Sequence, residues 1–537
     1  MENTQGPGPD FVDPTPYAVQ PAPRTDQIPA LPTPPPQPKP RMGKWVVIGL
    51  VVIALVGAGI LIVSRVLSGF PTLSPTDFPD AEFRACLEEH LEPGGGSAQD
   101  QLRALTDLDC TGHEIASIQG ASRLRSLVDL ALPWPNPDDV PRGGISDLTP
   151  LVTLDSLESL NLAGNQISSL APLGRLPNLV HLDLTHNQIS DLTPLEYMFN
   201  LRDLFLSMNQ IVDLTPLAGL TKLSLLGLGA NQITDLGPLG GLENLYWLGV
   251  QSNQISDLTP LATIGWIEEL DLGDNQIADL TPLLGLGTLR HLILPNNTIS
   301  DLSGLSALSE LSLLIVANNQ ITDLSPLRGL ANLAALSLSG NPISEVSVLA
   351  ELGALDTLDL EGLPAQDFSA LAGLVGLENL RISETSLSDL TPLAGLTNLT
   401  SLSLNENRIC DLSPLAALVN LELLSLFGNQ IVDLTPLAGL TRLEMLSLID
   451  NQISDITALA GLAAEIDATF QSLTATSTPG TPQPLPSVLG RGPITWRVYQ
   501  GDATIDGTTV TIAIDSEEDV ILSFTDDHQF DGQVRYA

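Results

Sequence analysis

A phrase of the form Asn-Gln-Ile-x-Asp-Leu-x-Pro-Leu returns through this chain at a fixed spacing of 22 residues. Five consecutive copies begin at Asn187, Asn209, Asn231, Asn253 and Asn275. A Leu-x-Leu step ahead of each copy has the period of a short strand, and the remainder is too brief for an α-helix. It must return through a turn and a short 3₁₀ segment. Because one such coil cannot bury its own leucines, neighbouring coils must stack around a shared core, which predicts a solenoid.

The 22-residue register holds from Asn165 to Asn451, which gives 13 intervals and 14 frames. Twelve frames begin with Asn, and the exceptions are Leu363 and Thr385. Two earlier frames extend the pattern toward the N-terminus, so residues 105–473 are assigned to an array of roughly sixteen coils. Eight extra residues follow the second coil, and we expect this insertion to form a surface loop.

This pattern is that of the leucine-rich repeat, and its 22-residue form closely resembles the internalin-type repeats of bacterial surface proteins. The resemblance implies an α/β-type repeat solenoid with a parallel sheet on the concave face and a 3₁₀ or irregular convex side. It also implies that the concave face binds a partner protein. Because contact residues vary from member to member of that family, the resemblance assigns no individual residue to a site.

Two columns of the repeat look like chemical sites, and both have a simpler structural explanation. An inward Asn satisfies backbone donors and acceptors left free where the strand bends, so the Asn column is interpreted as a buried ladder. Each Asp precedes Leu-x-Pro-Leu, which favours capping of a short helix, although a carboxylate row that binds calcium is the alternative. The Asp column contains Asp191, Asp213, Asp235, Asp257, Asp279, Asp301, Asp323, Asp389, Asp411, Asp433 and Asp455.

No motif for catalysis, phosphate binding or zinc binding occurs in the chain. His181, Asp183 and His186 supply too few ligands for a convincing metal site. We therefore predict a protein that is not an enzyme and that holds no cofactor or metal. With 63 acidic and 21 basic residues the net charge is −42, which disfavours nucleic acid and favours a basic protein partner or divalent cations.

The chain has three cysteines, Cys86, Cys110 and Cys410. Cys86 precedes the array and Cys110 lies in its first coil, so the two can meet if the preceding segment folds over that coil. A disulfide and a pair of small buried thiols are both open interpretations of these two residues. Cys410 follows a strand and is interpreted as an isolated thiol.

Residues 45–63 form an uncharged apolar run of 19 residues, long enough to span a bilayer as a helix. Residues 45–66 are assigned to a transmembrane helix, and the proline-rich residues 1–44 to a disordered tail. Basic residues before the run place the tail in the cytoplasm and the array outside it, as a single-pass protein of the cell membrane. A cleavable signal peptide is disfavoured, because 44 residues precede the run and no small-x-small cleavage site follows.

Both ends of the array are expected to be covered. Residues 76–104 are predicted to form a helical cap, in which Phe83 and Leu87 share a face, because a terminal coil must be shielded. Residues 474–490 have the composition of a linker. Residues 491–537 alternate as strands and weakly resemble the immunoglobulin-like module that follows internalin repeats, although the segment is too short for a full seven-strand sandwich.

Side chains that flank the inward leucines project onto the concave face, and the core does not dictate their identity. Apolar residues at these free positions predict an interface, in which Trp is a favoured anchor. The predicted partner-binding residues are His181, Phe205, Leu225, Trp247, Glu269, His291, Ile293, Leu313 and Ile315. A second apolar spot, formed by Phe427, Met445 and Ile449, has two open interpretations: a further interface, or packing against the C-terminal segment.

The sequence thus predicts a membrane-anchored, extracytoplasmic leucine-rich-repeat protein that binds a protein partner through its concave face, as an adhesin or a scaffold. Two alternatives stay open. An envelope sensor would couple ligand binding to the proline-rich tail. A structural envelope protein would be held together by cations on its acidic surface.

Overall fold

The computed structural model describes residues 72–135 and 143–475, together with the backbone of six strands between residues 483 and 536. Side chains are described through Ala468 and again at Gln471. The predicted loop after the second coil falls largely on residues outside this description.

The chain divides into two units, Met1–Arg65 and Val66–Ala537, and every described residue belongs to the second. The predicted tail (1–44) and membrane segment (45–66) therefore lie outside the described residues. Within the described part, no helix has the length and apolar content that crossing a membrane requires.

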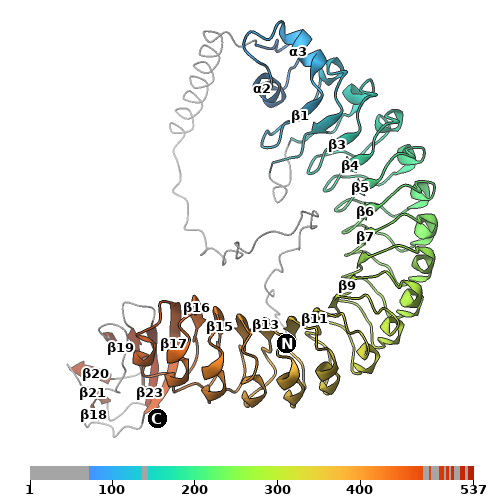
Figure 1. The fold of residues 1–537 in the computed structure, drawn as a ribbon. Helices are drawn as coiled ribbons and strands as arrows, with labels where there is room; N and C mark the ends of the chain where they lie inside the picture. The colour runs from blue at the N-terminus through green and yellow to red at the C-terminus, as the bar shows by residue number, and fades with distance from the viewer. Residues whose placement is uncertain are drawn as a thin grey trace, which may run out of the picture. The chain divides into compact units, whose positions relative to one another are not determined.

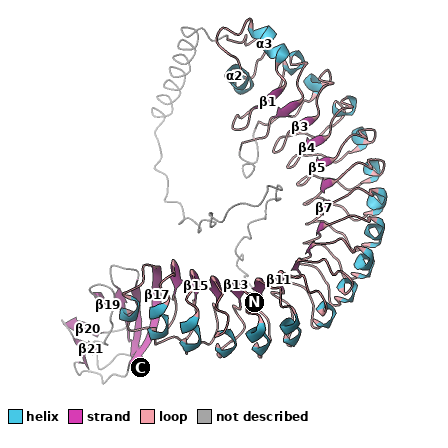
Figure 2. Ribbon diagram, in the orientation of Figure 1, coloured by secondary structure: helices cyan, strands magenta, loops and turns pink. Residues whose placement is uncertain are grey.

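One parallel sheet of seventeen strands runs along the inner side of an arc of stacked coils, and short 3₁₀ helices line the outer side (Figure 1, Figure 2). The strands are β1 Asp107–Asp109, β2 Asp129–Ala131, β3 Ser159–Asn161, β4 His181–Asp183, β5 Asp203–Phe205, β6 Leu225–Gly227, β7 Trp247–Gly249, β8 Glu269–Asp271, β9 His291–Ile293, β10 Leu313–Ile315, β11 Ala335–Ser337, β12 Thr357–Asp359, β13 Asn379–Arg381, β14 Ser401–Ser403, β15 Leu423–Ser425, β16 Met445–Ser447 and β17 Glu465–Ala475. The predicted solenoid, with its parallel concave sheet, is confirmed.

The 3₁₀ helices of the outer side fall between successive strands. They are η1 Ala121–Arg123, η2 Thr149–Leu151, η3 Leu173–Arg175, η4 Thr193–Leu195, η5 Thr215–Leu217, η6 Gly237–Gly241, η7 Thr259–Thr263, η8 Thr281–Gly285, η9 Ser303–Leu305, η10 Ser325–Leu327, η11 Ser347–Glu351, η12 Ser369–Gly373, η13 Thr391–Leu393, η14 Ser413–Ala417, η15 Thr435–Gly439 and η16 Thr457–Leu459. In most of them Pro occupies the second position, where its missing N–H costs no helical hydrogen bond.

Strand pairing preserves the sequence register. Leu226 in β6 lies opposite Leu248 in β7, 22 residues later, and both are fully buried. The spacing widens once, between β2 and β3, where Leu130 pairs with Leu160 across the eight-residue insertion. Each three-residue strand points its central side chain into the core and its two outer side chains to the concave face.

The Asn column forms the predicted ladder inside the core. The side-chain amide of Asn209 donates to the carbonyls of Leu184 and Leu206, at 3.0 Å each. Its oxygen accepts the N–H of Ile189 at 2.9 Å, so one side chain joins two coils. Buried backbone groups are paired in this way where water does not reach them. A rung that the sequence pattern did not reveal ends the ladder: Gln471 takes the place of Asn and accepts a backbone N–H of the preceding coil at 3.0 Å.

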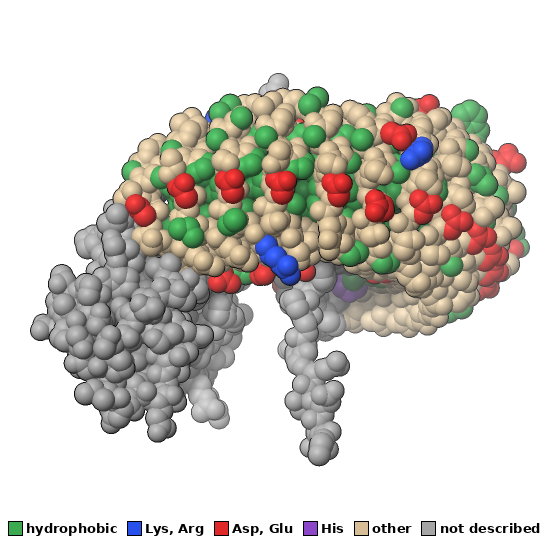
Figure 3. Space-filling model, turned by 90° about the horizontal axis from the view of Figure 1, so that it is seen from below, with side chains coloured by type: hydrophobic (Ala, Val, Ile, Leu, Met, Phe, Trp, Pro, Cys, Tyr) green, Lys and Arg blue, Asp and Glu red, His purple; other side chains and the backbone are tan. Residues whose placement is uncertain are grey.

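The Asp column lies on the outer side, where Figure 3 shows acidic groups in an evenly spaced row across the coils. Asp191 accepts the N–H of Thr193, the first residue of η4, at 2.9 Å, and its neighbours along the column repeat this bond. The Thr193 hydroxyl and N–H hold the pKa of Asp191 below its usual value. The predicted capping role is confirmed. Among the described residues, no three His, Cys, Asp or Glu side chains are arranged to hold a metal ion.

Two helices, α2 Ala81–Glu89 and α3 Ala98–Ala104, cover the first coil, and the sequence predicted only the first of them. Asp80 caps α2 by accepting the N–H of Phe83 at 2.9 Å. The glycine-rich segment between the helices makes a turn in which Gly94 and Gly96 have positive φ, a conformation that glycine adopts without strain.

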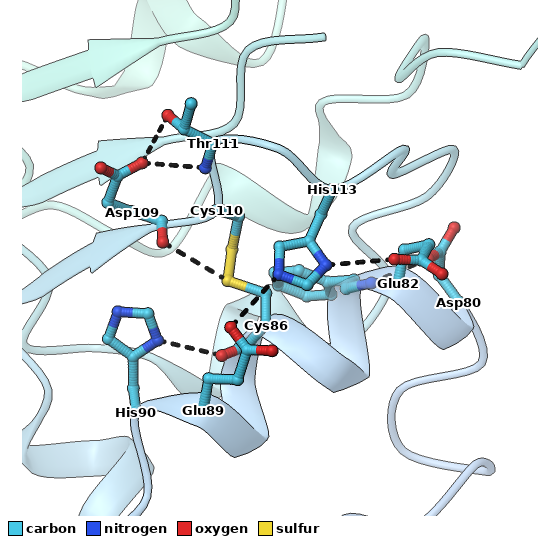
Figure 4. Close-up of a disulfide and its surroundings, with 10 residues drawn as sticks. Asp80, Glu82, Cys86, Glu89, His90, Asp109, Cys110, Thr111 and His113 are labelled. Atoms are coloured by element: carbon cyan, nitrogen blue, oxygen red, sulfur yellow. Dashed lines mark hydrogen bonds and ion pairs between the residues drawn. A yellow bond between two sulfur atoms is a disulfide. The ribbon is translucent and has the colours of Figure 1, made fainter. Parts of the chain in front are cut away.

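A disulfide between Cys86 and Cys110 joins α2 to the residue that follows β1, which decides between the two interpretations of these cysteines (Figure 4). His113 lies beside it, with its ring nitrogens 3.1 Å from a Glu82 oxygen and 3.4 Å from a Glu89 oxygen. The cap is therefore fixed to the array by a covalent bond as well as by apolar packing.

The sheet continues beyond the repeats. β17 pairs first with β16 and then, from Ala468 onward, in parallel with the last strand of the chain. The remaining strands are β18 Gln483–Pro484, β19 Thr495–Gln500, β20 Ala503–Asp506, β21 Thr509–Ile512, β22 Val520–Thr525 and β23 Phe530–Tyr536. β19, β22 and β23 extend this sheet, and β18, β21 and β20 form a second, antiparallel one. The segment predicted as a linker, 474–490, thus contains the end of β17 and all of β18.

Candidate functional site on the concave face

All nine predicted partner-binding residues occupy outer positions of strands β4 to β10, so they share the concave face. His181 is exposed and the other eight are half-buried. The structure sorts the apolar ones into two groups. Phe205, Leu225 and Trp247 lie on β5 to β7, whereas the aliphatic residues of β9 and β10 pair in register two strands further on.

The first group contains an aromatic pair. The ring centroids of Phe205 and Trp247 are 6.1 Å apart although two coils separate the residues in sequence. Gly227 and Gly249 provide the space beneath them: a Cβ on Gly249 would lie 2.8 Å from the Trp247 ring, and one on Gly227 would lie 3.0 Å from the Phe205 ring. The two ring planes are tilted by 50° to each other, and both rings pack closely over glycine backbone that has no side chains of its own.

Gln251 completes this surface, which we call the aromatic patch: Phe205, Gly227, Trp247, Gly249 and Gln251. The Gln251 amide lies over a third glycine, Gly229. A Cβ on Gly229 would lie 2.6 Å from the amide carbon. Its oxygen is buried and has no hydrogen-bond partner among the described residues. Buried polar atoms in folded proteins are normally paired, so this amide is one that gains from an incoming donor. The sequence analysis missed Gln251, although glycines at free positions of adjacent strands were a usable signal.

Carboxylates flank the aromatic patch on both sides along the sheet. On the N-terminal side, Asp203 pairs with His181, and burial raises the pKa of Asp183. On the other side, a Glu269 oxygen lies 3.3 Å from His291 Nδ1. Burial, and then the nearby carboxylates Glu268 and Glu269, raise the pKa of Tyr246 next to the patch. The field over this part of the concave face is therefore negative.

The residues once considered as a metal site do not converge. His181 bonds to Asp203, and Asp183 accepts the N–H of Thr185 at 2.9 Å. His186 lies in the turn after the strand with a positive φ of 56°, and its Nδ1 is buried without a partner in the described part of the chain. These three side chains therefore serve local structure separately.

The concave face of the later coils is different. Asn405 Oδ1 accepts both the Ser425 hydroxyl, at 2.7 Å, and the N–H of Phe427, at 3.0 Å. Ser403 bonds to Asn405 Nδ2 at 3.2 Å and to the Ser383 hydroxyl at 3.1 Å. These bonds join the polar side chains of this part of the face to one another. The second apolar spot, Phe427, Met445 and Ile449, is half-buried beside it.

The ladder gap creates a hollow on the flank of the array. Thr385, which replaces an Asn, bonds through its N–H and hydroxyl to Asn407 Oδ1, at 3.2 and 3.0 Å. A hollow of about 330 Å³ lies beside it, lined in part by Phe368 and Arg408. The 22-residue spacing continues through both frames, so the gap is local.

Three exposed aromatic residues lie off the concave face, and the sequence analysis did not single them out. Tyr197 and Trp266 are 71% and 70% exposed, and the Tyr197 and Phe199 rings meet edge-on at 6.1 Å. These residues follow 3₁₀ helices and precede strands, so they lie on the flank between the two faces. Trp266 provides a natural control for Trp247.

Comparison with known proteins agrees with this architecture. The family described as Leucine Rich repeats (2 copies) matches residues 155–197, 288–329, 375–417 and 419–461. The solved structure of the internalin InlF from Listeria monocytogenes is 31% identical, with a TM-score of 0.50, and the match covers 70% of this chain and 97% of that chain. No curated protein matches.

Two further solved structures show the same fold at lower identity. A leucine-rich-repeat protein of Leptospira interrogans is 24% identical, with a TM-score of 0.61, over 69% of this chain and 97% of that chain. The functional domain of InlJ from Listeria monocytogenes is 20% identical, with a TM-score of 0.56, over 86% of this chain and 98% of that chain. From its repeats, its ladder and its likeness to InlF, the chain belongs to the internalin-type leucine-rich-repeat proteins.

Proposed function

We propose that this chain is a membrane-anchored, extracytoplasmic protein that binds a basic protein partner on the concave face of β4 to β10. The observation that carries the proposal is the aromatic patch. Two large rings lie half-exposed on glycines at positions where the core requires neither ring. Apolar surface of this kind is typical of interfaces, and Trp is enriched among the residues that dominate their binding energy.

The surroundings of the patch define the chemistry of the partner. Carboxylates on β4, β5 and β8 flank the two rings, so a Lys or Arg of the partner would meet negative charge beside an aromatic face. The unpaired oxygen of Gln251 would accept one of its N–H groups after a small rotation of the amide. A partner segment with a basic residue next to an apolar anchor fits this arrangement.

Site-specific photo-crosslinking tests the location of the site. A photoreactive residue at Leu225, between the two rings in strand order, should trap the partner, whereas one at the exposed Val419 should not. The trapped protein is identified and its affinity for purified full-length chain is then measured. Trapping at both positions, or at Val419 alone, would place the site elsewhere.

Substitution of Trp247 tests the patch itself. Trp247→Ala should weaken binding of that partner by about 1.5–3 kcal/mol, the range of a buried interface aromatic. Trp266→Ala is the matched control, because this Trp is 70% exposed and lies off the concave face. Both variants should melt close to the parent chain. Equal affinity of Trp247→Ala and the parent would show that the aromatic patch is not the binding site.

Chemical labelling of the native thiol of Cys410 tests on which side of the membrane the array lies. Cys410 is exposed and free, and the other two cysteines form the disulfide. If the array is extracytoplasmic, a membrane-impermeant maleimide added to intact cells should label the chain, and Cys410→Ser should abolish the label. Labelling that appears only after cell lysis would contradict the proposed topology.

A further inference from the structure

A second candidate site lies at the start of the array, between the cap and the first coils. A hollow of about 830 Å³ opens there, bounded by residues 72–78, by α3 and by the segment around η1. Leu102 and Phe78 form an apolar base, each 2% exposed. The rim holds Arg103, Arg123 and Arg125, all exposed, so the hollow is both accessible and lined by positive charge.

This concentration of arginines is exceptional in so acidic a chain. Residues 72–135 and 143–475 contain twelve lysines and arginines, and three of them line this one hollow. Within the described part of the chain, Asp77 is the one acidic residue that lines the hollow. A protein with a net charge of −42 therefore has a local positive site beside its cap.

Two of the three arginines are available to a ligand. Arg123 pairs with Asp77. Arg103 and Arg125 have no ion pair or side-chain hydrogen bond within residues 72–135 and 143–475. Elsewhere in the array, arginines such as Arg290 pair with a Glu on a neighbouring coil, at 3.2 Å in that case. Ser74, Ser122 and Ser126 also line the hollow, and the Ser74 hydroxyl lies 2.7 Å from that of Thr76.

The donors that line the hollow fit a phosphate ester better than a carboxylate peptide. Arginine binds phosphate through two parallel N–H bonds, and hydroxyls add neutral donors to the remaining oxygens. Phe78 and Leu102 are almost fully buried, so the arginines and serines supply the recognition of the headgroup. The chain's own residues 64–71 do not complement the site, because this segment contains an arginine and no acidic residue.

Chain length places the hollow near the bilayer if the apolar run spans it. Eight residues separate Val63, the end of that run, from Thr72 on the lining of the hollow. Eight residues reach at most about 29 Å when fully extended. Clusters of Lys and Arg beside a membrane span bind anionic headgroups on the cytoplasmic leaflet, and the same attraction acts wherever the outer leaflet contains anionic phospholipid.

We propose that the hollow formed by Arg103, Arg123 and Arg125 binds the phosphate headgroup of an anionic phospholipid and so seats the capped end of the array on the membrane surface. This inference rests on the proposed membrane anchor. It is independent of the aromatic patch, which lies more than three coils away in the sequence.

Full-length chain in lipid nanodiscs provides the test. Discs of phosphatidylcholine alone are compared with discs that contain about one fifth phosphatidylglycerol, by hydrogen exchange at α3 and η1 and by the number of anionic lipids retained in native mass spectrometry. Phosphatidylglycerol should protect both segments in the parent chain. The double variant R103Q/R125Q should retain anionic lipid about tenfold less well, because two charged hydrogen-bond donors are lost.

Arg175→Gln is the matched control, because Arg175 is also exposed and without a side-chain partner in the described residues but lies on a separate coil. It should behave as the parent. Equal lipid retention by the parent and the double variant would overturn the proposal. So would equal or greater protection of α3 and η1 by glycerol phosphate, inorganic phosphate or an acidic peptide at matched ionic strength, since the ligand would then be a soluble anion.

A failure of the proposed membrane anchor can be distinguished from a failure of the headgroup site. If the chain does not enter nanodiscs, the membrane anchor is wrong, and the same full-length chain is titrated with soluble short-chain phosphatidylglycerol. Protection of α3 and η1 that depends on Arg103 and Arg125 would then support the headgroup site without the anchor. The absence of such protection would overturn the site itself.

Discussion

The strands β4 to β10 and the strands β11 to β16 share one core, but the side chains on their concave surfaces differ in chemistry. Leu248 and Leu424, one from each half, are 0% and 2% exposed. In the first half the concave face carries half-buried apolar groups, and the Gln251 side-chain oxygen there has no hydrogen-bond partner among the described residues. In the second half, serines at the outer positions of β14 and β15 bond to Asn405, which follows β14. Core and recognition are thus encoded at separate positions of the same repeat.

The largest expected effect tests whether the shared core is packed equally well in the two halves. Leu248→Ala and Leu424→Ala should each destabilise their own coils by about 3–5 kcal/mol, because both remove a fully packed side chain and leave a cavity. Hydrogen exchange of the strand amides in each half measures the local loss. If one substitution costs much less than the other, the halves differ in their cores as well as in their surfaces.

The next effect concerns the ladder, which is intact in the first half and interrupted in the second. Asn253→Ala removes hydrogen bonds to Leu228, Val250 and Ile233, at 2.9–3.0 Å, and should cost about 2–3 kcal/mol. Thr385→Asn should instead stabilise the second half by about 1 kcal/mol, because an amide there reaches the corresponding carbonyls of its own coil and the one before. Chemical denaturation, together with hydrogen exchange of the strand amides in each half, measures both changes in stability. Destabilisation by Thr385→Asn would mean that the gap is packed for Thr.

The smallest effect is electrostatic, and its sign can be derived from burial. Burial raises the pKa of Asp183 in the first half, so its charged form destabilises the fold above its unfolded-state pKa of 3.8. Asp183→Asn should therefore raise the melting temperature at neutral pH, and the gain should vanish below about pH 3.8.

Glu361, in the second half, is the comparison for Asp183. Burial raises the pKa of Glu361 as well, but the adjacent Arg381 lowers it in part. Glu361→Gln removes that ion pair, so it should stabilise the chain less than Asp183→Asn does in the same pH titration. A larger gain from Glu361→Gln would contradict the view that Arg381 offsets part of the cost of burying Glu361.

The repeat made much of the fold predictable. Its period of 22 residues places Leu226 opposite Leu248, and the type of each column predicts the Asn ladder and the Asp caps. These features depend on neighbours a fixed distance away in sequence. The two ends of the array were harder to predict. Neither α3 nor the rung at Gln471 follows the 22-residue period, so the repeat does not predict them.

The candidate site was predictable in outline. The free positions could be listed from the sequence, and all nine predicted residues do share the concave face. Their grouping could not be derived, because the Phe205 and Trp247 rings meet across the intervening strand β6, over Gly227. The same limit applies to Cys86, whose sequence environment allowed both a bridge and a thiol.

By itself, the sequence determined the coil, the core and the two structural columns, because a local period repeated sixteen times leaves one way to bury the leucines. The tertiary structure decided which free side chains meet, that Cys86 bonds to Cys110, and that arginines from α3 and from the segment around η1 line one hollow. The physical reason is distance along the chain. Side-chain contacts between coils and between cap and array depend on packing in space, which a one-dimensional period does not contain.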